Sequence, residues 1–326
     1  MTQTIPQHRP GSADLCSVLS RGAGEPAVGT AAEATCWLVL EQDGPWGARA
    51  ATQSRLDPDL GARLDAAVAA VGGRFALMRR PGAHPDRPTG LRQVLVAGGP
   101  VAEPWLVRGV VTGPDRLLDL PFEALADPTP ERLVAVLPEL APAAPVLLVC
   151  TNGKRDRCCA LTGRPLAEIA QRAFPGRVAE TTHLGGHRFA PTATVLPFGV
   201  SYARLDERTV VEALRAADQR RIPVALADPG HYRGRSGLLR PQQAAEQAYR
   251  ALTGDLGLPG PVVRDARPVG EGHWSVPVGD GPAQRLVEVS RVRTEALRPE
   301  SCGKDPVPVP IWQANVRTEG PGSAPR

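Results

Sequence analysis

Short apolar runs alternate with segments of helical period along the first two thirds of the chain. Such runs, bounded by glycine, proline and polar residues, are typical of strands, whereas apolar positions three and four apart indicate helices. The predicted helices cover residues 57–71, 159–174 and 207–220. The predicted strands cover residues 36–41, 74–79, 92–97, 105–111, 146–150, 177–182, 192–197 and 200–205. Strands that alternate with helices in this way predict an α/β fold.

Two stretches of this region repeat the same order of elements, which is a reason to look for internal duplication. The matching segments are 37–40 with 146–149, 57–71 with 159–174, 80–84 with 183–187, and 94–98 with 195–199. We therefore expect a duplicated α/β unit whose first copy is degenerate. The alternative is that any two β-α-β segments look alike at this level of detail.

The remaining segments complete a division of the chain into four regions. We expect a flexible arm over 1–35, a degenerate unit over 36–138, a second unit over 139–226 and a C-terminal α+β segment over 227–326. In the last region, the pattern predicts a helix over 242–252, strands over 274–278, 285–292 and 310–316, and a frayed tail over 318–326.

Composition and charge exclude several classes of protein. The 326 residues carry a net charge of +4 without any block of like charges, so nucleic-acid binding is not expected. The N-terminus lacks the apolar region of a secretory signal, and no apolar run is long enough to span a bilayer. We therefore expect a cytoplasmic protein without membrane contact, in which six cysteines favour metal binding or redox chemistry over disulfides.

Four residues of the second unit form a complete set of metal ligands: Cys150, Cys159, His183 and His187. Cys150 ends a predicted buried strand and Cys159 begins a helix, whose N-terminus favours anionic sulfur. The two histidines bracket a Leu-Gly-Gly sequence that can turn both imidazoles inward. Two thiolates and two imidazoles suit tetrahedral zinc, or an iron–sulfur cluster with one iron on cysteines and the other on histidines.

The spacing of the two cysteines separates these possibilities only in part. Zinc sites usually pair cysteines two to four residues apart, whereas eight residues separate Cys150 from Cys159. A loop of that length can wrap a two-iron cluster. The spacing alone leaves three interpretations open: an iron–sulfur cluster, a zinc ion, or four unrelated residues.

The segment CTNGKRDRCCALTGRPLAEIA, followed by HLGGHRFAPTATVLPFGVSYARL, resembles the sucrase/ferredoxin-like family of thioredoxin-like ferredoxins. The likeness is close over residues 146–205 and looser over most of the chain. It implies a thioredoxin-like ferredoxin domain that holds a [2Fe–2S] cluster on Cys150, Cys159, His183 and His187. The spacing of nine residues selects Cys159 over its neighbour Cys158. The implied function is electron transfer between redox donor and acceptor proteins that the sequence does not name.

Two other functions remain as alternatives to the electron carrier. One is a structural zinc domain that acts as an interaction module, and the other is a thiol oxidoreductase that uses Cys158 and Cys159. The second lacks the C-x-x-C motif of thioredoxin enzymes. No paired-carboxylate signature of a glycosidase is present, so an enzyme of that class is not expected.

The other cysteines and two arginines receive ordinary structural interpretations. Cys16 and Cys36 are expected to be small buried apolar residues, and Cys302 to be structural or without a role. Arg233 and Arg235, in the sequence HYRGRSG, are expected to lie in a solvated loop.

Overall fold

The computed structural model describes residues 15–82 and 91–317. Its strands are β1 (Trp37–Glu41), β2 (Arg74–Arg79), β3 (Arg92–Gly98), β4 (Trp105–Val111), β5 (Ala141–Pro142), β6 (Val146–Cys150), β7 (Val178–Thr181), β8 (Ala193–Leu196), β9 (Val200–Tyr202), β10 (Tyr232–Arg235), β11 (Arg267–Gly270), β12 (His273–Val278), β13 (Arg285–Arg298) and β14 (Val307–Val316). Its α-helices are α1 (Cys16–Gly22), α2 (Ala50–Gln53), α3 (Pro58–Ala70), α4 (Glu131–Val136), α5 (Arg157–Ala173), α6 (Glu207–Asp218) and α7 (Arg240–Thr253). The strands over 74–79, 105–111 and 146–150 have the predicted bounds.

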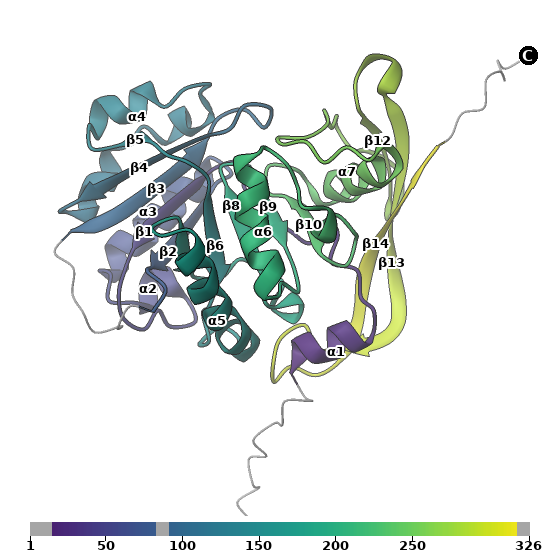
Figure 1. The fold of residues 1–326 in the computed structure, drawn as a ribbon, viewed down its shortest axis with the longest axis horizontal. Helices are drawn as coiled ribbons and strands as arrows, with labels where there is room; N and C mark the ends of the chain where they lie inside the picture. Colours follow the sequence, from purple (N-terminus) through teal and green to yellow (C-terminus); the bar gives the residue numbers. More distant parts are fainter. Residues whose placement is uncertain (1–14, 83–90, 318–326) are drawn as a thin grey trace, which may run out of the picture.

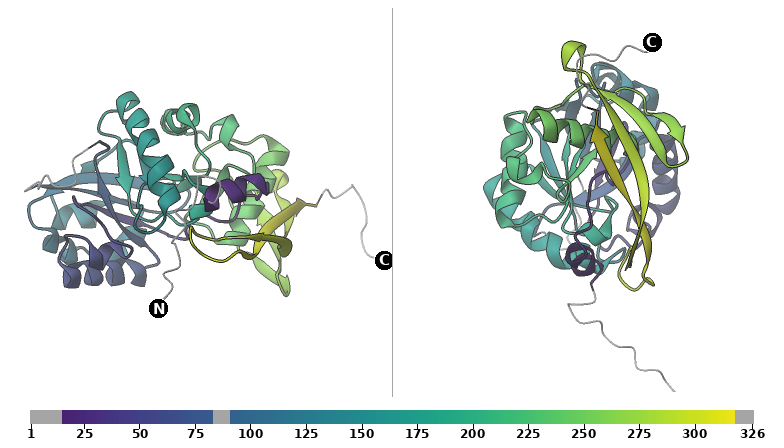
Figure 2. Two further views of the ribbon diagram at one scale, coloured as in Figure 1. Left: turned by 90° about the horizontal axis from the view of Figure 1, so that it is seen from below. Right: turned by 90° about the vertical axis from the view of Figure 1, so that its right-hand side faces the viewer.

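Two sheets organise these elements (Figure 1). The larger sheet has ten strands in the order β10-β9-β8-β6-β7-β2-β1-β3-β4-β5. The smaller sheet has four antiparallel strands in the order β11-β12-β13-β14 and stands at one end of the molecule, beside α7 (Figure 2). The predicted frayed tail and the first part of the predicted arm lie outside the described residues.

The large sheet consists of two halves with the same topology. In the first half, β1 pairs parallel with β2 and antiparallel with β3, and β3 pairs antiparallel with β4. In the second half, β6 pairs parallel with β7 and antiparallel with β8, and β8 pairs antiparallel with β9. Helix α3 connects the parallel strands of the first half, and α5 connects those of the second. The prediction of a degenerate copy before a thioredoxin-like unit is therefore confirmed at the level of topology.

The strand pairing shows which residues correspond in the two halves. Glu41 pairs with Met78 in the first half, and Cys150 pairs with Thr181 in the second, so Glu41 is the counterpart of Cys150. Two residues further along the partner strands, Arg80 is the counterpart of His183. The ligand positions of the second half are thus occupied by an acidic and a basic residue in the first.

One part of the predicted alignment is wrong by two residues. Leu38 pairs with Val96, and its counterpart Leu147 pairs with Val195. Val96, and not Val94, therefore corresponds to Val195. The reason is that the connection before the third strand is longer in the first half. His84, which the sequence aligned with His187, lies outside the described residues.

Alternation of side chains across the strands builds the cores of both halves. Leu38 and Leu40 are buried in one cluster with residues of α3. Their counterparts Leu147 and Val149 are buried in a second cluster with residues of α5 and α6. Residues on the opposite face of the central strands form a third cluster, which also contains Cys150 and the cysteines of α5.

Within the segment HYRGRSG, residues Tyr232–Arg235 form a buried strand and not the solvated loop that its polarity predicted. Strand β10 pairs antiparallel with β9, and Arg233 and Arg235 are almost fully buried. Arg235 forms an ion pair of 2.8 Å with Glu246 of α7, which offsets the cost of burying its charge. In the part of the chain that the structure describes, no helix combines the length and apolarity needed to cross a membrane.

A buried ion pair lies where the two halves meet, between β2 and β7. Arg79 donates from Nε and Nη2 to Oε2 of Glu180, at 2.9 and 2.6 Å. Thr151 donates to the same oxygen at 2.8 Å. The guanidinium of Arg79 also lies 4.4 Å from the ring centre of Trp46. Each buried charge has its counter-charge beside it. Removal of either one would leave the other buried and unpaired, which would lower the stability of the fold.

We predict that Glu180→Gln destabilises the protein by about 3 kcal/mol, because it leaves the buried Arg79 cation without its counter-charge. The matched control is Glu288→Gln, which breaks an exposed ion pair with Arg317 on the small sheet and should cost about 0.5 kcal/mol or less. Denaturant unfolding of both variants measures the difference. An equal loss of unfolding free energy in the two variants would contradict the claim that the buried ion pair between the two halves stabilises the fold.

Candidate metal centre at the start of helix α5

The first turn of α5 lies directly against the end of β6. Asp156 caps the helix by accepting the N–H of Cys158 at 2.9 Å. Gly163, one turn further on, packs against the strand: a Cβ there would lie 2.4 Å from the carbonyl oxygen of Cys150. This close approach brings Cys159 of the helix toward Cys150 of the strand.

The structure brings together the four ligands that the sequence predicted. The thiols of Cys150 and Cys159 are hydrogen-bonded to each other. The sulfur of Cys159 lies 3.6 Å from Nδ1 of His187. The rings of His183 and His187 are stacked, with centres 4.3 Å apart. Both cysteines and His187 are buried, whereas His183 is half-buried.

The loop that carries the two histidines depends on two glycines. Gly185 and Gly186 have φ values of +79° and +65°, in the region that glycine tolerates best. The N–H of Gly185 donates to Nδ1 of His183 at 3.2 Å. A Cβ on Gly186 would lie 2.5 Å from Nη2 of Arg233, so this position also allows a buried guanidinium to approach the loop.

The environment of the two thiols favours a thiolate on Cys150. The hydrogen bond from Cys159 lowers the pKa of Cys150 to about 7, and the N–H groups of Leu184 and Asn152 and the charge of Arg233 act in the same direction. Because Cys159 donates the proton of this hydrogen bond, the bond raises the pKa of Cys159, and burial raises it further. A cation bound between these sulfurs would displace the remaining proton.

The two imidazoles are held in the neutral form that binds metals. Burial lowers the pKa of His183 to about 3, and the positive charges of Arg74 and Arg155 add to the effect. Burial also lowers the pKa of His187, although Asp156 opposes the change. Neutral imidazole has a free lone pair, which a metal ligand requires.

Arg233 brings an uncompensated positive charge to this site. Its side chain is fully buried, and its Nη1 atom has no hydrogen-bond partner. Nε donates to the hydroxyl of Thr30 at 3.0 Å, and Nη2 donates to the carbonyl oxygen of the same residue. Burial lowers the pKa of this guanidinium to about 9, and the nearby sulfurs of Cys150 and Cys159 oppose that change. An unpaired donor of this kind fits a site that holds negative charge.

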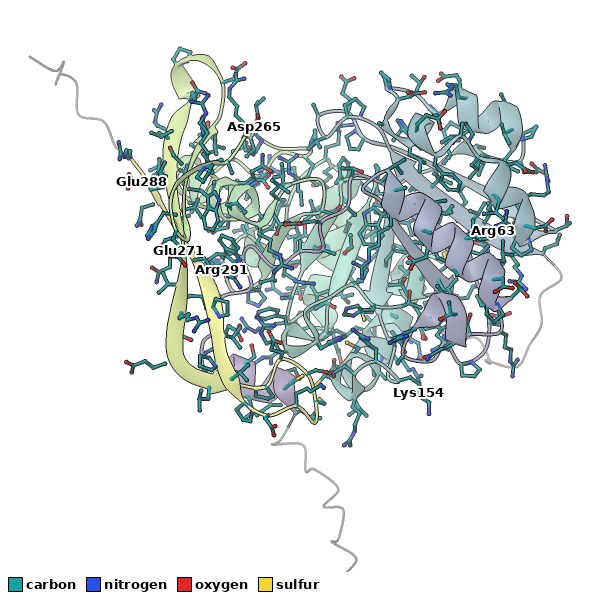
Figure 3. All side chains as sticks on the ribbon, turned by 180° about the vertical axis from the view of Figure 1, so that it is seen from behind. Arg63, Lys154, Asp265, Glu271, Glu288 and Arg291 are labelled. Atoms are coloured by element: carbon teal, nitrogen blue, oxygen red, sulfur yellow. The ribbon has the colours of Figure 1, made fainter. Side chains whose placement is uncertain are left out.

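A cavity of about 420 Å³ opens beside the histidine loop. His183 and Asn152 line it together with three cationic residues, Arg49, Arg74 and Arg155, and one acidic residue, Asp65. Lys154, from the loop between β6 and α5, lies at the molecular surface (Figure 3). His183 is therefore the predicted ligand that lies closest to a path from solvent.

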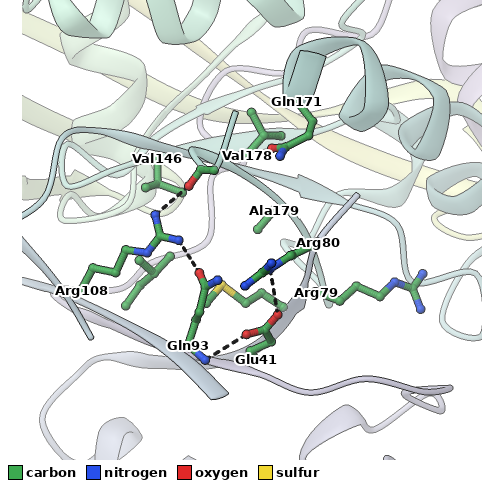
Figure 4. A pocket seen from close by; sticks show the side chains of 12 residues that line it. Glu41, Arg79, Arg80, Gln93, Arg108, Val146, Gln171, Val178 and Ala179 are labelled. Atoms are coloured by element: carbon green, nitrogen blue, oxygen red, sulfur yellow. Dashed lines mark hydrogen bonds and ion pairs between the residues drawn. The ribbon is translucent and has the colours of Figure 1, made fainter. Parts of the chain in front are cut away.

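The counterpart position in the first half holds an ion pair and lines a different cavity (Figure 4). Nε of Arg80 lies 3.6 Å from Oε1 of Glu41, and the N–H of Gln93 donates to the other carboxylate oxygen at 2.9 Å. Arg108 donates to the side chain of Gln93. This cavity, of about 260 Å³, is lined by these side chains and by the start of β6 and β7.

A second group of sulfur ligands adjoins the predicted one and was not expected. Ligand atoms of Cys16, Asp156, Cys158 and Cys302 all lie within 4.8 Å of one another, and no other group of three or more His, Cys, Asp or Glu residues in the described ranges does so. Cys16 is fully buried in the apolar core, as expected, and its sulfur also faces this group, to which Cys302 belongs. This buried Cys/Asp group has the donor set to bind a metal ion.

The comparisons with known proteins identify the family. The family model described as sucrase/ferredoxin-like matches residues 27–234, which is more than half of the chain. The chain therefore belongs to the sucrase/ferredoxin-like family, as the motifs around the two histidines indicated. No curated protein and no solved structure matched the chain.

We predict that the metal-free protein loses stability as the pH falls from about 6.5 toward 3, because the pKa of His183 is lower in the folded state than in the unfolded state. The unfolded chain therefore binds the additional proton in this window. His183 contributes a slope of at most about 1.4 kcal/mol per pH unit. Urea unfolding of wild type and His183→Asn at about pH 7.5 and about pH 5 measures this slope. An equal loss of unfolding free energy in wild type and His183→Asn would show that His183 does not cause the pH dependence.

Proposed function

We propose that this protein is a [2Fe–2S] electron-transfer protein whose cluster is held by Cys150, Cys159, His183 and His187. The observation that carries the proposal is the convergence of two thiols and two neutral imidazoles beside the unpaired guanidinium of Arg233. Bound there, the cluster would accept and release one electron at a time. The two cysteines would hold one iron and the two histidines the other.

The four proposed ligands form a less compact set than the adjoining Cys/Asp group. No three of their ligand atoms lie within 4.8 Å of one another, whereas the adjoining Cys/Asp group meets this limit. One zinc ion needs its ligands at the corners of a single small tetrahedron. Two irons bridged by sulfide span a wider set of ligands, and a cluster with one iron on each pair would also require Cys159 and His187, which lie 3.6 Å apart here, to separate.

The chain's own groups would tune the potential of such a cluster. The N–H groups of Leu184 and Asn152 point at the sulfur of Cys150, and hydrogen bonds to sulfur raise the potential. Arg233 supplies a positive charge that favours the electron-rich state. Neutral imidazoles replace two thiolates, so we expect a potential in the Rieske range of about −150 to +300 mV, above the roughly −400 mV of plant-type ferredoxins.

The position of His183 suggests how electrons reach the site. It is the half-buried ligand, and it lines the cavity that carries Arg49, Arg74 and Arg155. These cations would attract an acidic surface on a redox donor or acceptor protein. The other three proposed ligands are buried and would shield the cluster from solvent.

We predict that Cys150→Ser and Cys159→Ser abolish the visible absorption of the cluster and its bound iron, because each removes a thiolate ligand. Cys158→Ser and the control Cys36→Ser should keep both signals, since Cys158 faces the adjoining group and Cys36 lies under α3. The measurement is absorption with iron and sulfide counts on anaerobically purified protein. Loss of the cluster in Cys158→Ser, with retention in Cys159→Ser, would place the ligand one residue away.

We also predict that Arg233→Met makes the reduction potential more negative, because it removes a buried positive charge that stabilises the reduced cluster. Arg233→Lys is the control that keeps the charge, and its potential should stay nearer to that of wild type. Redox titration monitored by EPR gives the three potentials. An unchanged potential in Arg233→Met would show that its charge does not act on the cluster.

A further inference from the structure

The adjoining group of sulfur ligands has the dimensions of a tetrahedral zinc site. The three S···S distances are 3.5 Å between Cys16 and Cys158, 3.2 Å between Cys158 and Cys302, and 3.6 Å between Cys302 and Cys16. The Oδ1 atom of Asp156 lies 3.9 Å from the sulfur of Cys16. With Zn–S bonds of about 2.3 Å and Zn–O bonds of about 2.0 Å, tetrahedral edges measure about 3.8 and 3.5 Å. The group is therefore close to the size that one zinc ion requires.

We propose that Cys16, Cys158, Cys302 and Asp156 bind one structural zinc ion, separate from the site of the proposed electron carrier. Cys16 begins α1, Asp156 and Cys158 belong to the first turn of α5, and Cys302 lies in the loop between β13 and β14. Four protein ligands leave no open position for a substrate, as in zinc sites that serve structure. The proposal does not depend on the function proposed above.

Hydrogen bonds around the sulfur of Cys158 support a thiolate at this position. The hydroxyl of Ser17 donates to the sulfur of Cys158 at 3.2 Å, and the N–H of the same residue points at that sulfur as well. Donors of this kind stabilise the charged form of sulfur, which is the form that binds zinc.

Asp156 is oriented for the role of fourth ligand. Its Oδ2 atom accepts the hydroxyl of Ser301 and the N–H of Cys302, both at 2.8 Å. Its Oδ1 atom accepts the N–H of Cys158 at 2.9 Å. A carboxylate has about four lone-pair sites, so one lone pair remains for the metal. The donors from both segments fix the carboxylate between the helix and the loop.

A zinc ion here would join three segments that are remote in the sequence. Helix α1 lies beside the loop between β13 and β14, below α5 in Figure 1. Each of these segments is short or irregular and would gain order from a shared metal. The ion would hold the C-terminal hairpin and the N-terminal segment against the first turn of α5, the turn that also carries Cys159. We therefore expect zinc to rigidify the frame of the neighbouring site.

The test is the zinc content and zinc coordination of the purified full-length protein. Elemental analysis after dialysis against EDTA should find about one zinc ion per chain, and X-ray absorption at the zinc edge should find three sulfurs at about 2.3 Å and one lighter ligand at about 2.0 Å. Cys302→Ser and Cys16→Ser should lose this zinc while the iron content stays the same. Cys36→Ser, a buried cysteine outside the group, is the matched control and should keep it.

Each other outcome has a distinct meaning. Wild-type protein without zinc, or zinc retained in both Cys302→Ser and Cys16→Ser, would overturn the proposal and leave the iron–sulfur function untouched. A disulfide between Cys158 and Cys302 in place of bound zinc would overturn it as well. Zinc coordinated by two sulfurs and two nitrogens would place the ion on the histidines and contradict both proposals. If a variant fails to fold, the coordination measured on wild type still decides.

Discussion

The first turn of α5 must lie against the end of β6, and both proposed metal sites depend on that contact. Gly163 makes it possible, because a side chain there would collide with the carbonyl of Cys150. Consecutive residues of a helix point about 100° apart, since 3.6 residues complete a turn. Cys159 therefore faces Cys150 and His187, while Cys158 faces Cys16 and Cys302. The vicinal cysteines thus face two different groups of side chains, and this separation argues against a thiol oxidoreductase that uses them as a pair.

Duplication explains why only one half of the large sheet carries the donor set. Both halves have the same strand order, and the buried pair of Arg79 and Glu180 joins them. At the positions of Cys150 and His183, the first half has Glu41 and Arg80, whose charges lie 3.6 Å apart. An ion pair can fill these positions without a metal and without a change of topology. The degenerate half thus extends the sheet and supports the proposed site through the shared junction.

The sequence predicted most of the fold and the four residues of the proposed cluster, because these depend on local pattern. Strands such as 146–150 are apolar runs between turn residues, and the four proposed ligands lie at or beside two loops of one unit. The Cys/Asp group could not be predicted in this way, since Cys16 and Cys302 are far from Cys158 in the sequence and meet only through tertiary packing. The polar pattern of β10 predicted a loop because nothing local shows that Glu246 neutralises Arg235. The sequence aligned Val94 with Val195, two residues away from the true counterpart Val96, because the sequences of the strands do not show how long the loop before them is.

The central claim is that two histidines and two cysteines hold a two-iron cluster at the end of β6. Pulsed EPR of the chemically reduced protein, with histidine labelled uniformly with ¹⁵N, tests this claim most directly. Coordination by His183 and His187 predicts strong couplings from two imidazole nitrogens, which change with the isotope and fall to one in His183→Cys. A reduced cluster that shows no strong nitrogen coupling, or whose couplings do not respond to labelled histidine, would contradict it.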